Sequence, residues 1–157
     1  MQKIAPCLWF DGKAEEAARF YVSLFKNSKI TKIKRWGEVG PGPKDSVLTV
    51  TFQLEGQDFM ALNGGPDFKL TPAISLMVDC KNQSEVDDLW EKLSAGGQQM
   101  DCGWVTDKFG VSWQVVPTIL MEMISDQDQK RADRVMAAMM KMKKLEFAPL
   151  QAAYEGR

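Results

Sequence analysis

Residues 102–117, CGWVTDKFGVSWQVVP, predict two short β-strands joined by a tight turn at DKFG. The second strand carries Gln114 between Trp113 and Val115. This hairpin is the last part of an order of elements that occurs twice along the chain.

The first copy begins with an apolar segment at residues 3–10, which predicts a strand. The following segment, DGKAEEAARFYVSLFKNSK, has apolar residues at helical spacing, with acids early and lysines late, as the helix macrodipole favours. We expect Asp11 or Gly12 to cap this helix. Further strands are predicted at residues 29–36, 47–54 and 58–63, with a loop at GEVGPGPKD (37–45) and a hairpin turn at EGQ (55–57).

The second copy repeats this order. TPAISLMVDC (71–80) predicts a strand, and NQSEVDDLWEKLSAGGQ (82–98) predicts a helix with Ser84 and Asp87 as its capping pair. Gly96 and Gly97 supply its left-handed stop. QQMDCGWVT and VSWQVV then form the final hairpin. A strand, a helix and several strands therefore occur in each half, and neither half could close a core alone.

Residues 118–157 are helical by pattern, and Met136, Met139 and Met140 follow one stripe, which indicates core or dimer packing. A chain of 157 residues with 45% hydrophobic residues is long enough for one domain with a sizeable core. We therefore expect a single domain over residues 1–157. Its parts are module one (1–66), module two (70–117) and a C-terminal helical extension (118–157).

The charge pattern excludes several classes of partner. The net charge is −1 and 26% of the residues are charged, with both signs interspersed, so neither nucleic acid nor an anionic membrane is an expected partner. No segment approaches the ~20 apolar residues of a membrane span, and the first residues lack the apolar run of a signal peptide. We expect a cytoplasmic protein.

The sequence contains no histidine. This excludes Ser-His-Asp and Cys-His systems, histidine bases and the iron site of two histidines and a carboxylate. The three cysteines, Cys7, Cys80 and Cys102, form an odd set without CxxC spacing, which indicates buried free thiols rather than a disulfide framework or a structural zinc site. No lysine or arginine adjoins Cys7 or Cys102 to activate the thiol.

Four strings resemble the PhnB-like branch of the vicinal oxygen chelate superfamily, which includes glyoxalases, bleomycin-resistance proteins and dioxygenases. They are LWFDGKAEEAARFYVSLF, ALNGGPDFKLTPAISLMVDC, CGWVTDKFGVSWQVVP and AAMMKMKK, and together they span essentially the whole chain. The branch carries the family label 3-demethylubiquinone-9 3-methyltransferase. The resemblance implies an α+β fold in which two βαβββ modules form a cupped eight-stranded mixed sheet, followed by C-terminal helices.

Metalloenzymes of this superfamily hold their ion with side chains from the first, fourth, fifth and eighth strands. The matching positions here are Ala5 or Pro6, Met60, Ala73 and Gln114. None of them is an imidazole or a carboxylate, and an amide oxygen is a poor replacement for a carboxylate on a divalent cation. The resemblance therefore implies a cup without a metal, and no cofactor is expected.

The methyltransferase label has little support in the sequence. S-adenosylmethionine is usually held on a glycine-rich turn that leads from a strand into a helix. The pairs Gly64–Gly65 and Gly96–Gly97 follow a hairpin strand and a helix, respectively. We interpret the label as inherited nomenclature.

The cup implied by the resemblance has apolar walls and a few polar groups, as a small-molecule pocket does. Each tryptophan in it either stacks on a ligand or belongs to the core. Gln114 either orients a ligand or makes a structural hydrogen bond. The expected lining residues are Cys7, Trp9, Met60, Asn63, Ser75, Met77, Trp104 and Gln114.

Three functions remain open. The first is a metal-free homodimer that binds an unidentified small molecule, as the sequestering bleomycin-resistance proteins do. The second is an enzyme with non-standard active-site residues: a lyase, an isomerase, a dioxygenase or the methyltransferase of the family label. The third is an interaction protein whose methionine-rich helices matter most.

Overall fold

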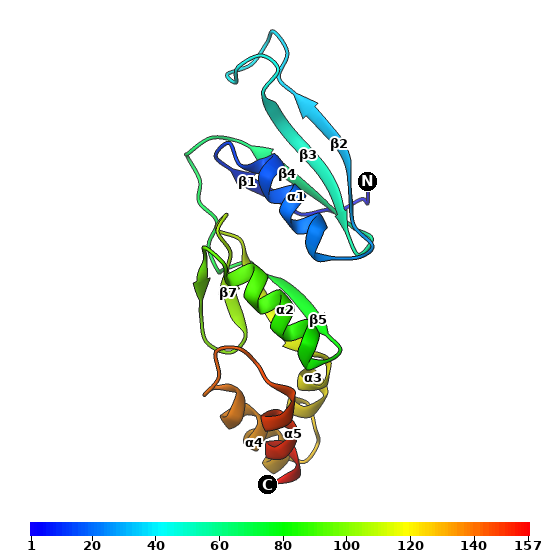
Figure 1. The fold of residues 1–157 in the computed structure, drawn as a ribbon, viewed down its shortest axis with the longest axis vertical. Coiled ribbons are helices and arrows are strands. Elements are labelled where there is room, and N and C mark those ends of the chain that lie inside the picture. Colours follow the sequence, from blue (N-terminus) through cyan, green and yellow to red (C-terminus); the bar gives the residue numbers. More distant parts are fainter. The chain divides into compact units, whose positions relative to one another are not determined.

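A computed structural model describes all residues from 1 to 157. The chain forms two compact units, Met1–Leu70 and Thr71–Arg157 (Figure 1).

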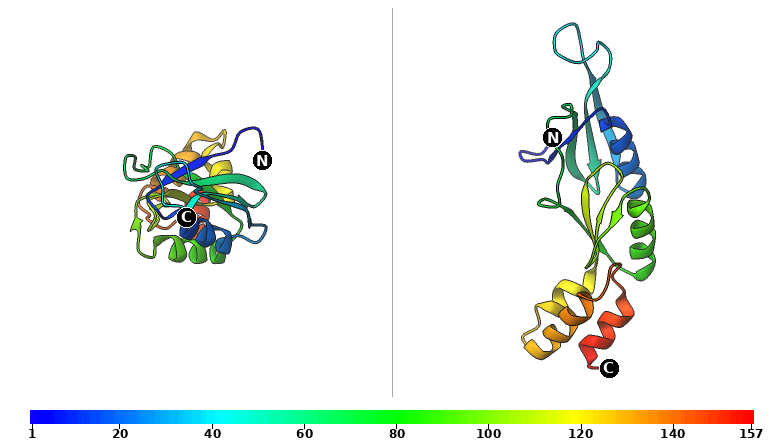
Figure 2. Two further views of the ribbon diagram at one scale, coloured as in Figure 1. Left: turned by 90° about the horizontal axis from the view of Figure 1, so that it is seen from above. Right: turned by 90° about the vertical axis from the view of Figure 1, so that its left-hand side faces the viewer.

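The unit Met1–Leu70 is a four-stranded sheet with one helix on one face. The strand order is β1-β4-β3-β2, in which β1 runs parallel to β4 and the other pairs are antiparallel. Helix α1 packs on β3 and β4 (Figure 2). The elements are β1 (Cys7–Phe10), α1 (Ala14–Leu24), β2 (Lys29–Arg35), β3 (Val47–Leu54) and β4 (Gln57–Asn63).

Alternation along the strands places every second side chain beneath α1. Phe52 and Phe59 stack there with ring centroids 5.4 Å apart, and the fully buried Tyr21 contributes from the helix. The β3–β4 turn is tight because Glu55 and Gly56 both have positive φ, of 47° and 82°, as a two-residue hairpin turn requires.

Helix α1 is capped by a residue distant in sequence, so the expectation of a cap at Asp11 or Gly12 was wrong. The backbone N–H of Ala14 donates to Oδ1 of Asn63, at 2.9 Å, and Lys13 makes no side-chain cap. Gly12 instead provides the turn into the helix, with φ of +75°. A residue at the end of β4 satisfies the exposed N–H group at the helix start.

The unit Thr71–Arg157 begins with the same arrangement. Its sheet has the order β5-β8-β7-β6, with β5 parallel to β8. The repeated βαβββ order predicted from the sequence is therefore confirmed, with one four-stranded mixed sheet in each unit. The elements are β5 (Leu76–Cys80), α2 (Gln83–Ser94), β6 (Gln98–Gln99), β7 (Trp104–Thr106) and β8 (Ser112–Pro117).

Two strands of this unit are shorter than predicted. The strand expected at residues 71–80 begins only at Leu76, because residues 71–74 form a turn in which Ile74 N–H donates to Thr71 O. The strand expected at residues 98–106 is divided into β6 and β7, because Cys102 and Gly103 adopt left-handed φ values of 59° and 81°.

The caps of α2 also differ from the prediction at one end. Asn82 is the N-cap, accepting the N–H of Glu85 at 2.9 Å, and the Glu85 carboxylate accepts the N–H of Lys81. This pair resembles a capping box, except that the carboxylate accepts from the residue before the N-cap, and it lies two residues before the expected Ser84 and Asp87. The C-terminal stop at Gly96, with φ of +74°, is as predicted.

The helical extension packs against the end of the second sheet. It contains α3 (Thr118–Ile124), α4 (Gln129–Met139) and α5 (Phe147–Glu155). The N–H groups of Cys102 and Gly103 donate to the carbonyls of Met142 and Lys143, at 2.8 and 2.7 Å. The cluster at its centre is Val116, Leu120, Met123, Val135, Leu145 and Leu150.

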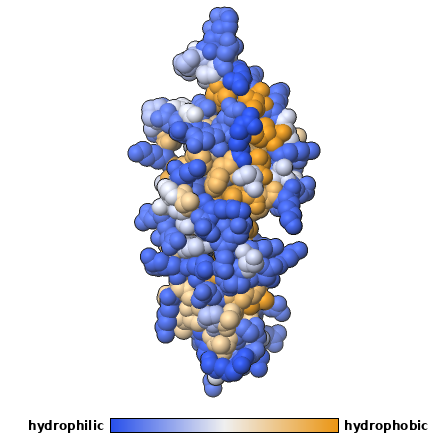
Figure 3. Space-filling view, viewed as in Figure 1, coloured by the Kyte–Doolittle hydropathy of each residue, from blue (hydrophilic) through white to orange (hydrophobic).

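The predicted methionine stripe is divided between core and surface. Met139 packs against the central cluster, whereas Met136 and Met140 are exposed. Figure 3 shows apolar side chains on the surface over α4 and α5. None of the helices is long and apolar enough to cross a membrane.

Candidate functional site

The sheet of unit Met1–Leu70 leaves the face opposite α1 open. Cys7 and Trp9 of β1 lie on this face, in register with Met60 and Leu62 of β4. Their neighbours Leu8, Phe10, Phe59 and Ala61 are buried on the face beneath α1. The alternation therefore places three expected cup residues, Cys7, Trp9 and Met60, together on one surface.

The outer half of this open face is polar. Thr51 and Thr49 of β3 lie opposite Met60 and Leu62 of β4. Lys32 and Lys34 of the edge strand β2 lie opposite these two threonines. Both lysines are exposed and make no ion pair within the unit. Lysines on an edge strand also discourage pairing with a second sheet.

The buried carboxylate of Asp58 lies at one end of the open face. Asp58, 6% exposed, accepts hydrogen bonds from Gln53 Nε2 at 2.8 Å and from the backbone N–H of Gln2. These bonds lower the pKa of Asp58 below its ordinary value, the bond from Gln53 contributing most. This carboxylate is therefore engaged within the protein and is not free for a ligand.

Asn63 differs from the other expected lining residues. It has the opposite parity to Met60 and Leu62, and both atoms of its amide group are engaged. Oδ1 accepts from Ala14 N–H, and Nδ2 donates to Val47 O at 3.1 Å. Asn63 therefore lies on the α1 side of the sheet, where it caps that helix, and it also lines a pocket at one end of this sheet.

The sheet of unit Thr71–Arg157 also has an open face, opposite α2. Gln114 of β8 lies between Met77 of β5 and Trp104 of β7 in the register. Gln114 Nε2 donates to Ser75 Oγ at 2.9 Å. The four remaining expected residues therefore lie together, and the Gln114 amide makes a structural hydrogen bond that leaves its oxygen without a partner in this unit.

The positions expected for metal ligands do not form a metal site. Met60 and Gln114 hold equivalent places in the two sheets, opposite Cys7 and Met77, whereas Ala73 precedes β5 in a turn. Within neither unit do three Cys, Asp or Glu side chains gather in a way that could hold an ion. The residues present therefore do not fit the divalent cation of the superfamily's metalloenzymes.

Two of the three free thiols have raised pKa values. Cys80 is buried as predicted, whereas Cys7 is exposed and Cys102 is half-buried. Partial desolvation raises the pKa of the Cys7 thiol, and burial followed by the charges of Glu85 and Asp79 raises the pKa of Cys80 to about 12. Cys102 lies in the turn before β7 and outside the strands where it was expected. Because the thiolate is the nucleophilic form, Cys7 and Cys80 are poor nucleophiles at neutral pH.

We expect iodoacetamide at pH 7.5 to alkylate Cys7 more slowly than a cysteine in an unfolded peptide, and Cys80 only after denaturation. A raised pKa lowers the thiolate fraction at a given pH, so the rate should increase as the pH rises toward the pKa. Peptide mass spectrometry of time points between pH 7 and pH 10 measures each site. Rapid alkylation of native Cys80 at pH 7.5 would contradict this assignment.

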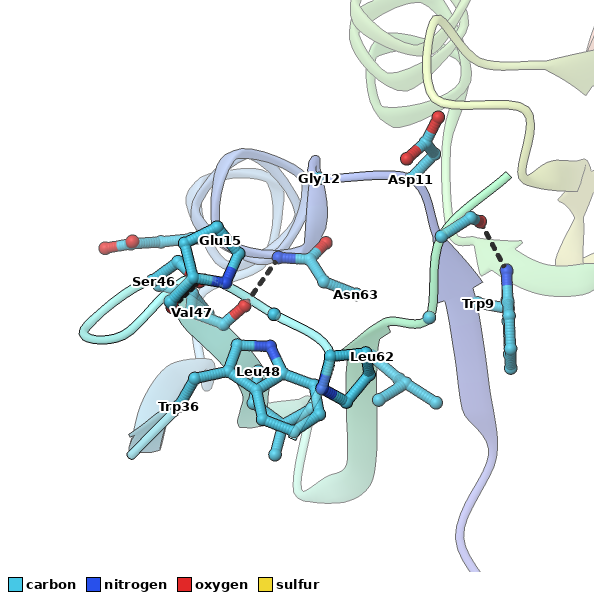
Figure 4. Close-up of a pocket in the computed structure, with 15 residues that line it drawn as sticks. Trp9, Asp11, Gly12, Glu15, Trp36, Ser46, Val47, Leu48, Leu62 and Asn63 are labelled. Carbon is cyan, nitrogen blue, oxygen red and sulfur yellow. Dashed lines mark hydrogen bonds between the residues drawn. The ribbon is translucent and has the colours of Figure 1, made fainter. Parts of the chain in front are cut away.

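A pocket of about 610 Å³ lies at one end of the first sheet (Figure 4). Trp36 and Trp9 contribute indole rings to its lining, and Leu48 and Leu62 contribute apolar surface. The sequence does not predict this pocket. It is lined by Trp9, Asp11, Gly12, Glu15, Trp36, Pro41, Gly42, Pro43, Ser46, Val47, Leu48, Leu62, Asn63, Gly64 and Gly65.

Trp36 organises the β2–β3 loop that covers the pocket. Its backbone N–H donates to Ser46 O and its carbonyl accepts from Asp45 N–H, both at 2.9 Å. A Cβ on Gly40 or Gly42 would lie 2.2 or 2.0 Å from atoms of the indole. Only glycine permits this close approach, so the glycines in the loop are the sequence signal that Trp36 is packed by its own loop.

Trp9 plays a similar role for the segment after β4. Its Nε1 donates to Gly65 O at 2.8 Å, and a Cβ on Gly64 would lie 2.4 Å from its ring. Phe68 meets the indole edge-on, with centroids 4.9 Å apart. The Gly64–Gly65 pair therefore packs on an aromatic side chain.

Residues 2–116 match the family model described as 3-demethylubiquinone-9 3-methyltransferase. The chain belongs to this family. The structure described as a putative 3-demethylubiquinone-9 3-methyltransferase, PhnB protein, from Bacillus cereus is 42% identical, with a TM-score of 0.69. The match covers 74% of this chain and 99% of that one, which confirms the resemblance to the PhnB-like branch.

Two more distant structures support the fold alone. Protein PA1353 from Pseudomonas aeruginosa is 23% identical, with a TM-score of 0.62, and the match covers 74% of this chain and 98% of that one. The fosfomycin resistance protein FosX from Listeria monocytogenes, complexed with Mn(II) and sulfate, is 15% identical, with a TM-score of 0.52 and coverage of 72% and 90%. No curated protein matches the chain.

The family match ends at Val116, so the helical extension lies outside it. We expected the resemblance to span essentially the whole chain, including AAMMKMKK. That string falls in the extension, and the family model does not cover it.

Proposed function

We propose that this member of the PhnB-like family is a metal-free homodimer that binds a small molecule, resembling bleomycin-resistance-type proteins. The observation that carries the proposal is the state of Gln114. It stands at a position expected for a metal-binding carboxylate, and its amide nitrogen donates to Ser75 Oγ. An amide held in this way is a poor ligand for a divalent cation.

The surfaces that remain suit an organic ligand. Each sheet has an open face on which apolar or sulfur-containing side chains lie beside a few hydroxyl or amide groups. The pocket of about 610 Å³ in the first unit has indole and leucine surfaces. A lining of this kind, with few polar groups, is typical of small-molecule sites.

Native mass spectrometry of freshly purified protein without a polyhistidine tag tests this function. We expect a species of twice the 17.7 kDa chain mass, with no bound transition metal and with added mass from a co-purified organic molecule or from metabolites supplied afterwards. A protein without histidine avoids the usual adventitious imidazole ligands once the tag is absent.

A stoichiometric transition metal in this experiment would contradict the metal-free proposal and favour an enzyme of the superfamily with non-standard ligands. A monomer mass at micromolar concentration would refute the dimer. Absence of any bound molecule across a metabolite library would favour an interaction protein.

A further inference from the structure

The pocket beneath the β2–β3 loop has few polar side-chain atoms free to meet a ligand. The Trp9 indole N–H is bonded to Gly65 O, and both ends of the Asn63 amide are bonded within the unit. Glu15 accepts two hydrogen bonds from the Arg19 guanidinium, at 2.7 and 3.1 Å. Its charge is therefore balanced by a neighbour on the same helix.

Two polar groups of the lining remain unengaged. The Asp11 carboxylate stands exposed at the rim, with no ion pair or hydrogen bond (Figure 4). The indole N–H of Trp36 has no acceptor in the protein. The pocket thus offers one free negative charge and one free hydrogen-bond donor around an apolar surface.

The charge of the lining is of one sign. It contains two carboxylates and two indoles, and it contains no lysine or arginine. The face of an indole attracts a cation through its quadrupole, and an unpaired carboxylate attracts one directly. An anionic ligand would meet no complementary charge there.

We propose that this pocket binds an organic cation, an amine or amidine joined to a flat apolar body. The inference rests on the proposed function and specifies the class of ligand. The ammonium or amidinium pairs with Asp11, the apolar body packs on Leu48 and Leu62 beside the indole of Trp36, and an acceptor on the ligand takes the Trp36 N–H. The volume of about 610 Å³ lies within the range of roughly 300–1,000 Å³ of such sites and is large enough for a phenyl ring with a short charged side chain.

Three probes with the same aromatic body and different charge test the proposal on the full-length chain. They are phenethylamine (cationic), 2-phenylethanol (neutral) and 3-phenylpropionate (anionic), and calorimetric titration at low and moderate salt measures their affinities. We expect phenethylamine to bind about three- to fivefold more tightly than the alcohol, as an exposed charge pair allows, and the anion to bind most weakly. Added salt should reduce the difference.

Two charge-matched variants locate the effect. Asp11→Asn should weaken phenethylamine binding by about the same three- to fivefold while leaving 2-phenylethanol unchanged. Glu91→Gln removes one negative charge from an exposed position of α2 outside the pocket lining and should change neither. Indole N–H signals of Trp9 and Trp36, assigned through Trp→Phe variants, should shift when phenethylamine is added.

The outcomes separate this inference from the proposed function. Equal or tighter binding of the alcohol or the anion, or failure of phenethylamine to bind at millimolar concentration, would overturn the cation assignment. Binding that Asp11→Asn and Glu91→Gln weaken equally would overturn it too, because the effect would then be one of net charge. The small-molecule function would still be decided independently by the native mass measurement.

Discussion

Replacing Asp107 with alanine is expected to destabilise unit Thr71–Arg157 by about 3–5 kcal/mol, because a buried hydrogen-bonded charge would be removed and its partners left unpaired. Asp107 is 3% exposed. Oδ1 accepts the backbone N–H groups of Phe109 and Val111, and Oδ2 accepts the indole N–H of Trp113 at 2.8 Å. Urea unfolding followed by circular dichroism measures the loss, and hydrogen exchange of the peptide covering residues 105–116 locates it.

Two further variants define the effect of Asp107. Asp107→Asn keeps an acceptor for the backbone N–H groups and should cost less than the alanine variant. Asp101→Ala changes an exposed aspartate without a side-chain hydrogen bond, six residues earlier, and should lie within about 0.5 kcal/mol of the parent. If Asp107→Ala were as mild as Asp101→Ala, the carboxylate would not organise the hairpin.

Asp107 also illustrates what the sequence could and could not predict. DKFG was correctly identified as the hairpin turn, because Gly110 and the flanking apolar residues mark it locally. The bond from Trp113 to Asp107 was missed, since nothing in the alternation shows that one buried indole reaches back across the turn. Local patterns determine where a turn lies, whereas the partner of a buried polar group depends on packing.

The helix caps also include one feature that the local sequence predicts and one that depends on packing. Gly96 was predictable because a left-handed glycine is a local requirement. The cap of α1 was not, because Asn63 lies 49 residues away from Ala14 in the chain. Strand alternation places Asn63, an expected lining residue, on the opposite side of β4 from Met60 and Leu62, where it caps α1 and also lines the pocket.

The open faces of the two sheets followed from period-two alternation, which brings Cys7, Trp9 and Met60 together in one unit. The pocket at the end of the first sheet did not. Its lining depends on Gly40 and Gly42 folding against Trp36, and GEVGPGPKD predicts only that a loop is present. Close approach of backbone to an aromatic ring becomes visible only in three dimensions.

The family match ends before the helical extension, and a set of contacts holds the extension to the rest of the unit. Gly103 lies on the sheet side of the contact and Leu145 on the extension side. Gly103 has φ of +81°, and its N–H donates to Lys143 O. Leu145 is fully buried, and its carbonyl accepts from Gln83 Nε2. Substitutions at this contact therefore test how much it contributes to holding the extension in place.

Gly103→Ala is expected to destabilise the unit by about 3 kcal/mol or more, through a strained left-handed alanine and overpacking. A Cβ there would lie 2.8 Å from Leu145 Cδ1 and 2.9 Å from Val115 O. Leu145→Ala alone should cost about 2–5 kcal/mol, because it leaves a cavity in the central cluster. The double variant should be more stable than the sum of the two predicts, by about 1 kcal/mol, since the clash with Leu145 is removed; urea unfolding of all three variants measures these differences.

Gly110→Ala is the matched control, because Gly110 also has a left-handed φ, of +91°, but no neighbouring atom lies within 4 Å of the place that an alanine methyl group would take. It should show only the cost of the left-handed alanine, about 1–2 kcal/mol. The difference in destabilisation between Gly103→Ala and this control measures the cost of the contacts with Val115 and Leu145. The double variant separates the contribution of Leu145 from that of Val115. Additive losses, or a Gly103→Ala variant no less stable than Gly110→Ala, would contradict a rigid contact between Gly103 and Leu145. The extension would then be held by the backbone bonds of Cys102 and Gly103 and by Gln83 of α2.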